Sequence, residues 1–419
     1  MVLFKKVTLL EDHALRNDLT PDGPIGVVGA SAAGLFSALL FARAGRQVRV
    51  FERAERLDPA VRTLIVTERI RNILGPSLEK CAVNEIRGIE LFTDGRAAAI
   101  QLDVPDLVIE RSRLIRALAD EAQKHGAHLE FGRRFVSLQG TGTGIEMTFA
   151  GLATRECERV RCTTVVGADG AQSSVALSAG WPKLPTVPLV QAVVNLPAGM
   201  PAHTVRVWFV PDDTPYFYWL IPESSKQGVL GLIGVEGHRT RRCLEQFMEK
   251  RHFRALAFQG ARIPVYQSWV PIERRIAQGR VYLVGDAAAQ VKVTTLGGVV
   301  TGFRGALAVA ERILNGGFGP ELRALRRELD LHMLIRRSIH GFRQADYSRL
   351  VDWMNDGMRR SLSRLNRDQA ARLLWHVCRS QPRLLWLGLR GLLAPRPEVP
   401  RQADSAPEMS VWGTSVIQR

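Results

Sequence analysis

The chain has 419 residues, 46% of them hydrophobic and 23% charged, a balance that excludes a disordered or collagen-like protein and is typical of a globular one. Its net charge of +16 favours anionic neighbours, although a solvated basic surface explains it equally well. The five cysteines form no C-x-x-C pair, the nine histidines have no metal-binding spacing, and no apolar run reaches the length of a membrane-spanning helix. We therefore assign no metal and expect a reducing, cytoplasmic location.

The first predicted elements form a nucleotide-binding unit. Residues 1–23 are expected to be an N-terminal extension, and residues 25–28 a buried strand that leads into a helix. The turn between them is Gly-Ala-Ser-Ala-Ala-Gly, made of Gly29, Ala30, Ser31, Ala32, Ala33 and Gly34. Such a turn directs free N–H groups and the positive end of a helix at a pyrophosphate. Serine replaces the second glycine of the usual pattern, so it either sets the phosphate back or donates its hydroxyl to it.

The next strand, over residues 48–51, ends at Glu52, eighteen residues beyond Gly34. A carboxylate at this place accepts hydrogen bonds from both hydroxyls of an adenosine ribose and repels a 2′-phosphate. The sequence therefore predicts FAD or NAD as the nucleotide, rather than NADP.

Two further apolar strands end in a glycine-flanked acid. A hairpin with an Asp-Gly turn is predicted over residues 90–102 and a helix over residues 111–126. The later apolar strands run into Asp169 and into Gly285-Asp286, with a β-rich, antiparallel stretch over residues 187–235 between them. Because the carboxyl ends of parallel strands share one edge of a sheet, we expect the three loops to meet over one extended ligand.

At these loops the sequence resembles the FAD-dependent oxidoreductases of the para-hydroxybenzoate hydroxylase fold, and within them the geranylgeranyl reductase family. Residues 285–298, Gly-Asp-Ala-Ala-Ala-Gln-Val-Lys-Val-Thr-Thr-Leu-Gly-Gly, follow that family's G-D-A-A-G-x-V-K-P-T-T-G-G-G. The resemblance implies non-covalent FAD, with Glu52 on the adenosine ribose and Arg111 near the diphosphate. It also implies that Asp286 binds the ribityl chain or the pyrophosphate and that Gly297 and Gly298 lie against the isoalloxazine.

Other positions complete the expected cofactor site. The redox-related cysteine that the reductases carry shortly after the ribose acid is absent, and Arg62 in that region is a candidate for holding the flavin or another anionic group. The remaining expected cofactor-binding residues are Gly29, Ser31, Ala32, Ala33, Gly34, Arg53, Asp169 and Gly285.

Residues 217–222, Phe-Tyr-Trp-Leu-Ile-Pro, are similar to the reductases' Y-x-W-x-F-P and also to the W-x-W-x-I-P of flavin-dependent halogenases. The two-residue period of a strand places Phe217 and Trp219 on one face. We expect them to wall a catalytic cavity beside the flavin, and ordinary sheet packing explains them equally well.

The end of the chain is helical and basic, with eighteen arginines and ten acidic residues from residue 321 onward. Residues 367–393 carry Trp375 and Trp386 among leucines and arginines, a pattern that suits either a membrane interface or a helical lid packed on the FAD-binding domain. A peripheral location at the inner face of the membrane therefore stays open.

The predicted fold is α/β, a Rossmann-like FAD-binding domain with an inserted antiparallel β-sheet substrate domain and a C-terminal helical region. The expected division is an N-terminal extension (1–23), an FAD-binding domain (24–90, 110–178 and 276–318), a substrate-binding β domain (91–109 and 179–275), a helical region (319–396) and a flexible tail (397–419).

The leading functional hypothesis is an FAD-dependent enzyme that reduces carbon–carbon double bonds of a small apolar substrate, isoprenoid or lipid-like. The alternatives are a flavin monooxygenase or halogenase acting on an aromatic or polyketide-like molecule, and a basic membrane- or nucleic-acid-binding protein with a vestigial flavin fold. No specific nucleic acid is expected as a partner. The chain has no second G-x-G-x-x-G, so NAD(P)H, a ferredoxin or a partner reductase remain open as the electron donor.

Overall fold

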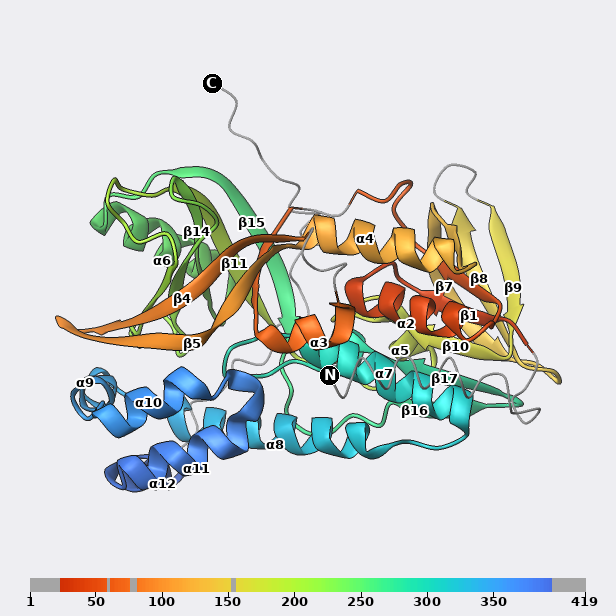
Figure 1. The fold of residues 1–419 in the computed structure, drawn as a ribbon. Coiled ribbons are helices and arrows are strands. Elements are labelled where there is room, and N and C mark those ends of the chain that lie inside the picture. The colour runs from red at the N-terminus through yellow and green to blue at the C-terminus, as the bar shows by residue number, and fades with distance from the viewer. Residues whose placement is uncertain (1–22, 59–60, 76–80, 152–155, 394–419) are drawn as a thin grey trace.

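The computed structural model describes residues 23–58, 61–75, 81–151 and 156–393. Nearly all of the expected N-terminal extension and the whole expected tail, residues 397–419, lie outside these ranges. The fold is mixed α/β, with two large sheets and a set of C-terminal helices (Figure 1). This is the predicted class and arrangement.

The first large sheet has six strands in the order β16-β17-β10-β1-β2-β6. All neighbours are parallel except β16, which pairs antiparallel with β17. The strands are β1 (Ile25–Val28), β2 (Val48–Phe51), β6 (His128–Glu130), β10 (Thr164–Gly167), β16 (Glu273–Ile276) and β17 (Gly279–Leu283). Every residue of β1 and β10 is buried, as expected for parallel strands that are covered on both faces.

Helices cover one face of this sheet, and a small antiparallel sheet covers the other. The helices are α2 (Ala32–Arg43), α4 (Arg111–Lys124) and α7 (Val299–Asn315), with α2 packed between the other two. The small sheet consists of β7 (Arg133–Gly140), β8 (Ile145–Gly151) and β9 (Cys157–Cys162). Phe149 of β8 stacks on Phe51 of β2 with ring centroids 4.4 Å apart, which joins the two sheets. The short helix α5 (Ser174–Ser178) follows β10.

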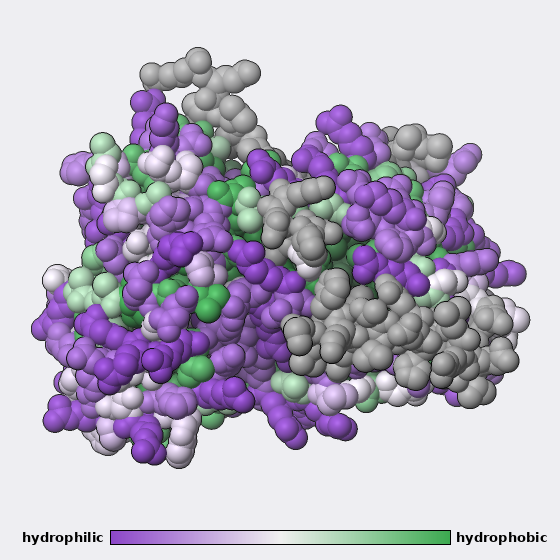
Figure 2. Space-filling view, viewed as in Figure 1, coloured by the Kyte–Doolittle hydropathy of each residue, from purple (hydrophilic) through white to green (hydrophobic). Residues whose placement is uncertain are grey.

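The second large sheet has eight strands in the order β15-β11-β14-β13-β12-β4-β5-β3, antiparallel except for the pair β12 and β4. Its strands are β3 (Thr63–Val66), β4 (Ala82–Thr93), β5 (Arg96–Glu110), β11 (Thr186–Asn195), β12 (Thr204–Trp208), β13 (Tyr218–Pro222), β14 (Gln227–Ile233) and β15 (Ala255–Pro264). Helix α6 (Gly237–Lys250) covers one face. Hydrophilic residues dominate the face of the molecule in Figure 2, with small apolar patches between them.

This sheet contains more of the chain than the expected substrate-binding β domain. Residues 63–66 and 82–90 were assigned to the FAD-binding domain, yet they form β3 and the first part of β4. The boundary differs because the hairpin is long: β4 and β5 stay paired from the Asp94-Gly95 turn back to Ala82. The expected hairpin over residues 90–102 was its tip. Between β3 and β4 lie a 3₁₀ turn, η1 (Glu68–Ile70), and a short helix, α3 (Arg71–Leu74).

The C-terminal helices run beneath both large sheets (Figure 1). They are α8 (Pro320–His340), α9 (Gln344–Asp352), α10 (Asp356–Arg364), the 3₁₀ turn η4 (Arg367–Gln369), α11 (Ala370–Ser380) and α12 (Arg383–Leu393). Helix α8 packs on α7, where buried Arg304 forms ion pairs with Glu321 and Glu328. Helices α9 and α10 pack on the β4–β5 hairpin. The helical region therefore holds the two large sheets together.

Two helical glycines are expected to respond oppositely to substitution by alanine. At Gly34 the added Cβ would lie 2.2 Å from the carbonyl oxygen of Gly29, and at Gly388 it would meet no atom within 4 Å. Gly34→Ala should lower the free energy of unfolding by ~1–3 kcal/mol, and Gly388→Ala should raise it by ~0.5–1 kcal/mol. Denaturant unfolding of both variants measures this, and a stabilised Gly34→Ala would contradict the close approach of α2 to its preceding turn.

Candidate cofactor site

The turn between β1 and α2 has the geometry needed for a close approach to a phosphate. Gly29 has a φ of +103°, and a Cβ there would lie 2.6 Å from the carbonyl oxygen of Ala168. Helix α2 begins at Ala32, and Ser31 caps it by accepting a hydrogen bond from the N–H of Gly34 at 3.2 Å. Because that bond uses only an acceptor lone pair, the hydroxyl hydrogen of Ser31 stays able to donate to a phosphate.

The three predicted loops meet at the carboxyl edge of the six-stranded sheet. A Cβ on Gly29 would lie 3.0 Å from the Cα of Asp169, which follows β10. A Cβ on Gly285, which follows β17, would lie 2.9 Å from the Cβ of Ala33 in the first turn of α2. Asp286 therefore stands beside the turn that begins at Gly29, and the expected convergence of the loops is confirmed.

Asp286 interacts electrostatically with two arginines, Arg62 and Arg111. Backbone pairing brings these together, because the N–H of Arg111 donates to the carbonyl oxygen of Arg62 at 2.9 Å. Burial raises the pKa of Asp286, and the two guanidinium groups oppose that rise. Burial and the repulsion of Arg62 lower the pKa of Arg111 to about 10.

The arginine pair has a donor left over. The Nε of Arg62 is buried and has no hydrogen-bond partner among the described residues. A buried N–H without a partner is costly, and here it lies beside a second guanidinium group. An anion bound here would accept a hydrogen bond from the unpaired N–H and would reduce the repulsion between the two guanidinium groups. The pyrophosphate of FAD is an anion that such donors bind. Sequence reasoning placed Arg62 and Arg111 separately, and the structure brings them together.

Glu52 is held at the same edge by backbone groups. Its Oε2 accepts a hydrogen bond from the N–H of Ala30 at 2.8 Å, and its Oε1 accepts one from the N–H of Ala54 at 3.0 Å. The carboxylate is half-buried beside the phosphate turn, in the place where a dinucleotide fold holds its ribose. Arg53, the neighbouring candidate, is exposed.

The side chain of Asp169 forms hydrogen bonds at the start of α5. Its two carboxylate oxygens accept hydrogen bonds from the Oγ of Ser173 at 2.5 Å and from the N–H of Val175 at 3.1 Å. Ser173 is the N-cap of α5 and Val175 lies in its first turn, so Asp169 helps to hold the start of that helix. Burial raises the pKa of Asp169, and these hydrogen bonds oppose the rise. The contribution of Asp169 to the loop edge is its backbone, which lies against Gly29.

The loop over residues 291–298 turns tightly in front of α7. The N–H of Lys292 donates to the carbonyl oxygen of Gly297 at 3.2 Å, and Gly298 caps α7. A Cβ on Gly298 would lie 3.2 Å from the Oδ1 of Asp286, so this glycine allows the helix N-terminus to approach the carboxyl group. The first N–H groups of α7 are free of helical partners and favour negative charge in front of them.

Polar side chains of the C-terminal helical region bind the 291–298 loop, and the sequence analysis did not identify them as part of the site. Lys292 forms a buried ion pair with Asp368 of η4, and Asp368 also accepts a hydrogen bond from the hydroxyl of Thr67. Burial alone would raise the pKa of Asp368, but the charge and hydrogen bond of Lys292 lower it to about 2. Lys292 stands inside the quoted motif, whereas nothing in the pattern around Asp368 indicates its partner.

A second contact comes from α8. The Nδ1 of His332 lies 2.7 Å from the Oγ1 of Thr294, and its Nε2 is buried without a partner in the described part of the chain. Burial and the nearby charge of Lys292 lower the pKa of His332 to about 4, so the ring is neutral at pH 7. Two residues of the loop are thus fixed by two different C-terminal elements.

The two aromatic residues expected to wall a cavity lie on the side of the second sheet that faces this loop. Phe217 and Trp219 pack in one apolar cluster with Val291 and Leu296, and their ring centroids are 6.1 Å apart. The intervening Tyr218 packs on the opposite face against α6. The expected two-residue alternation is confirmed, although Phe217 lies one residue before β13. The indole N–H of Trp219 is buried and has no partner within the described residues.

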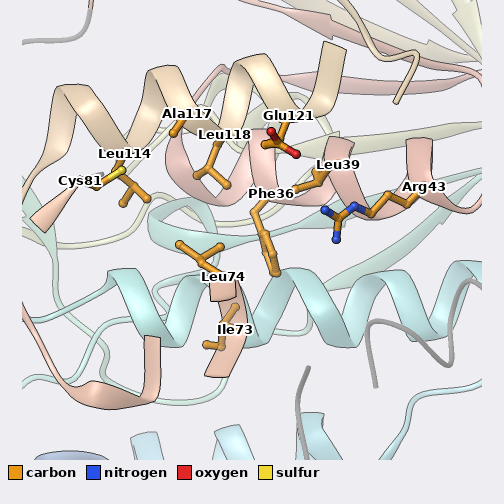
Figure 3. A pocket seen from close by; sticks show the side chains of 10 residues that line it. All are labelled: Phe36, Leu39, Arg43, Ile73, Leu74, Cys81, Leu114, Ala117, Leu118 and Glu121. Atoms are coloured by element: carbon orange, nitrogen blue, oxygen red, sulfur yellow. The ribbon is translucent and has the colours of Figure 1, made fainter. Parts of the chain in front are cut away.

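A separate cavity of about 100 Å³ lies between α2, α3 and α4 (Figure 3). Its walls are mainly apolar, with one arginine and one glutamate. They are Phe36, Leu39, Arg43, Ile73, Leu74, Cys81, Leu114, Ala117, Leu118 and Glu121. None of the expected cofactor or catalytic residues lines it, so it is distinct from the loop edge.

The neutral state of His332 predicts a loss of stability in acid. Above pH 6.5 the ring is neutral in both the folded and the unfolded chain, but between pH 6.5 and 4 only the unfolded chain takes up the proton. This should lower the free energy of unfolding by up to ~3 kcal/mol over that interval. His332→Gln should flatten the pH profile of denaturant unfolding, whereas exposed His125→Gln should leave it unchanged. An unaltered profile in His332→Gln would contradict the assignment.

Comparison with known proteins agrees with this geometry. A family model described as an FAD binding domain matches residues 22–315. Digeranylgeranylglycerophospholipid reductase 2 of Methanothermobacter thermautotrophicus is 28% identical over 298 residues, which are 65% of this chain and 73% of that protein. Aklavinone 12-hydroxylase of Streptomyces purpurascens is 28% identical over 343 residues, covering 68% of this chain and 59% of the hydroxylase.

Among solved structures, a geranylgeranyl bacteriochlorophyll reductase-like protein from Thermoplasma acidophilum superposes with a TM-score of 0.72. The match covers 88% of this chain and 99% of the other at 18% identity, so it shows a shared fold. The family match spans more than half of the chain and includes every loop that converges on Asp286. The chain therefore belongs to the family defined by this FAD-binding domain and is an FAD-dependent oxidoreductase.

Proposed function

We propose that this enzyme holds FAD non-covalently along the carboxyl edge of the six-stranded sheet. In this proposal the pyrophosphate lies on the turn from Gly29 to Gly34, and the guanidinium groups of Arg62 and Arg111 neutralise it. Glu52 accepts the hydrogen bonds of the adenosine ribose. The unpaired buried Nε of Arg62 and the glycines that allow close approach support this placement.

We further propose that the enzyme reduces carbon–carbon double bonds of an apolar substrate, isoprenoid or lipid-like. Bound reduced FAD would supply a hydride to one carbon of such a bond and be oxidised to FAD, and a proton taken up from solvent would complete the other carbon. The chain itself contributes the N-terminus of α7, capped by Gly298, which favours the negative charge of a reduced flavin. Phe217 and Trp219 would hold the substrate against the 291–298 loop and exclude water. NAD(P)H or a partner reductase would supply the electrons.

The proposal of an apolar substrate is based on one structural observation. The cluster that joins the second sheet to the 291–298 loop is built from aliphatic and aromatic side chains, including Trp219, Val291 and Leu296. Partly buried apolar residues of β4, β5 and β11 pack against the same cluster, so a substrate bound beside it would meet an apolar surface. The similarity to a reductase named for a digeranylgeranyl lipid points the same way.

Hydroxylation of an aromatic, polyketide-like molecule is the second candidate. It is favoured by the similarity to a hydroxylase named for aklavinone and by the unpaired indole N–H of Trp219, which could bind a polar substituent of such a substrate.

The two candidates give products of different composition. The holoenzyme, reduced with dithionite without oxygen and mixed with a geranylgeranylated glycerolipid, should yield a product with two more hydrogen atoms for each bond reduced. Mass spectrometry detects this gain. Incorporation of oxygen into an aromatic polyketide in air, with no reduction of the lipid, would overturn the first candidate in favour of the second.

Two tryptophans on opposite faces of the second sheet provide a matched pair of variants for this assay. Trp219 and Trp208 are both buried and both have an indole nitrogen without a partner in the described chain, but only Trp219 joins the cluster at the 291–298 loop. Trp219→Phe should raise the KM for the apolar substrate about ten-fold, because the smaller ring leaves part of the wall open. Trp208→Phe should leave KM unchanged, and equal effects would count against the pocket.

Arg62 provides a test of the FAD site that is independent of turnover. Arg62→Met removes one charged donor to the pyrophosphate, a loss of ~1.5–3 kcal/mol, so the FAD dissociation constant should rise on the order of 10- to 100-fold. Fluorescence titration of the apoprotein with FAD measures this constant. Arg56→Met, at an exposed ion pair with Asp58, is the control. An unchanged FAD affinity in Arg62→Met would show that the pyrophosphate lies elsewhere.

A further inference from the structure

Exposed apolar side chains gather on the last two helices of the described chain. Seven of the thirteen large hydrophobic residues that are well exposed within the described ranges belong to α11 and α12. They are Leu374, Trp375, Leu385, Trp386, Leu389, Leu392 and Leu393. Trp375 is 67% exposed, Trp386 59% and Leu389 60%. We call these seven residues the α11–α12 patch.

Helix α12 is apolar on two opposite faces. Its inner face packs on the protein, since Leu387 joins a cluster with Phe342 and Tyr347, and a Cβ on Gly391 would lie 1.8 Å from the carbonyl oxygen of Ser338 in α8. Its five residues of the patch follow the spacing i, i+1, i+4, i+7 and i+8, which is one stripe of a helix. This stripe lies opposite the packed face, so α12 presents an apolar surface that no residue of the described ranges covers.

The charges carried by α11 and α12 themselves have one sign. From Ala370 to Leu393 the chain carries four arginines and no acidic residue. Arg372 and Arg379 are exposed on α11. Arg383 lies over the ring of Trp353, and Arg390 pairs with Asp346 while lying 5.5 Å from the ring centroid of Trp386. The patch is therefore an apolar surface within a cationic rim.

We propose that the α11–α12 patch docks the enzyme on an anionic lipid bilayer, with both helices lying in the interface. Tryptophan and arginine are suited to this depth, because the indole body is apolar with a polar edge and the guanidinium group pairs with lipid phosphate. No helix of the described ranges has the length and apolar character needed to cross a bilayer. The helices lie on the membrane surface and do not span it.

Charge also argues against a second copy of this chain as the occupant. In a two-fold dimer each patch would face an identical one, which would bring the two sets of arginines together without acidic partners on these helices. An anionic membrane provides the opposite charge over the whole rim. The docking surface is also attached directly to the 291–298 loop, because α11 continues from η4, where Asp368 holds Lys292.

The test is flotation of the full-length holoenzyme with vesicles, which needs no turnover and does not depend on the proposed reaction. The protein should float with vesicles of phosphatidylcholine and phosphatidylglycerol, bind at least several-fold less to phosphatidylcholine alone, and dissociate as salt is raised. The double substitution Trp386→Gln and Leu389→Gln should lower binding to the anionic vesicles on the order of ten-fold. Leu177→Gln, at an exposed leucine of α5, is the matched control.

A second variant separates charge from apolar contact. Arg372→Gln with Arg379→Gln should lower binding to anionic vesicles roughly ten-fold and leave binding to neutral vesicles unchanged. Flavin absorbance and the melting temperature check that each variant is folded. Unchanged vesicle binding in both double variants would overturn the proposal. So would a dimer in light scattering that the Trp386 and Leu389 substitutions convert to a monomer, because the second copy would then be the occupant.

Discussion

The whole site depends on one constraint, the parallel registry of β1, β10 and β17. Because these strands are neighbours and run in one direction, the turns that follow them come to one edge. Two approaches at that edge are too close for any side chain, Gly29 against Ala168 and Gly34 against Gly29. The backbone is thereby exposed to a ligand, and the side chains of Arg62, Arg111 and Asp286 supply the charges around it.

The helical region completes the second end of the site. The 291–298 loop closes through backbone hydrogen bonds at Lys292, and its polar side chains are held from outside by Asp368 and His332. A buried ion pair contributes little net stability because both charges lose their hydration, but it fixes the position of both partners. The pairing of Lys292 with Asp368 therefore matters for where the loop lies more than for how stable the protein is.

The sequence predicted the elements whose signal is local. Glycine positions, the acid that ends β2 and the period of two around Phe217 follow from steric and periodic rules, and all of them are found in the structure. The extent of the β4–β5 hairpin was underestimated because its far half alternates weakly between buried and exposed residues.

Contacts between distant segments could not be predicted. Lys292 and Asp368 are 76 residues apart, and Thr67 and Asp368 are 301 apart, so no spacing rule connects them. The capping role of Asp169 was also missed, since a glycine-flanked acid after a strand suits a ligand and a helix N-terminus equally well. Arg62 and Arg111 were found one at a time, and only the pairing of β3 with β5 shows that they form one group.

Buried ion pairs connect the FAD-binding part of the chain to the C-terminal helical region. The match to the family model ends at residue 315. Arg304 and Lys292 lie inside it, but the carboxylates that pair with them lie beyond it, at Glu321, Glu328 and Asp368. A fragment cut at that boundary would lose these counter-ions together with α8 and η4, which carry them, so neither the buried ion pairs nor the packing of α8 on α7 could form. The boundary drawn by similarity therefore runs through buried contacts of the described structure, and it does not mark the edge of a packed unit.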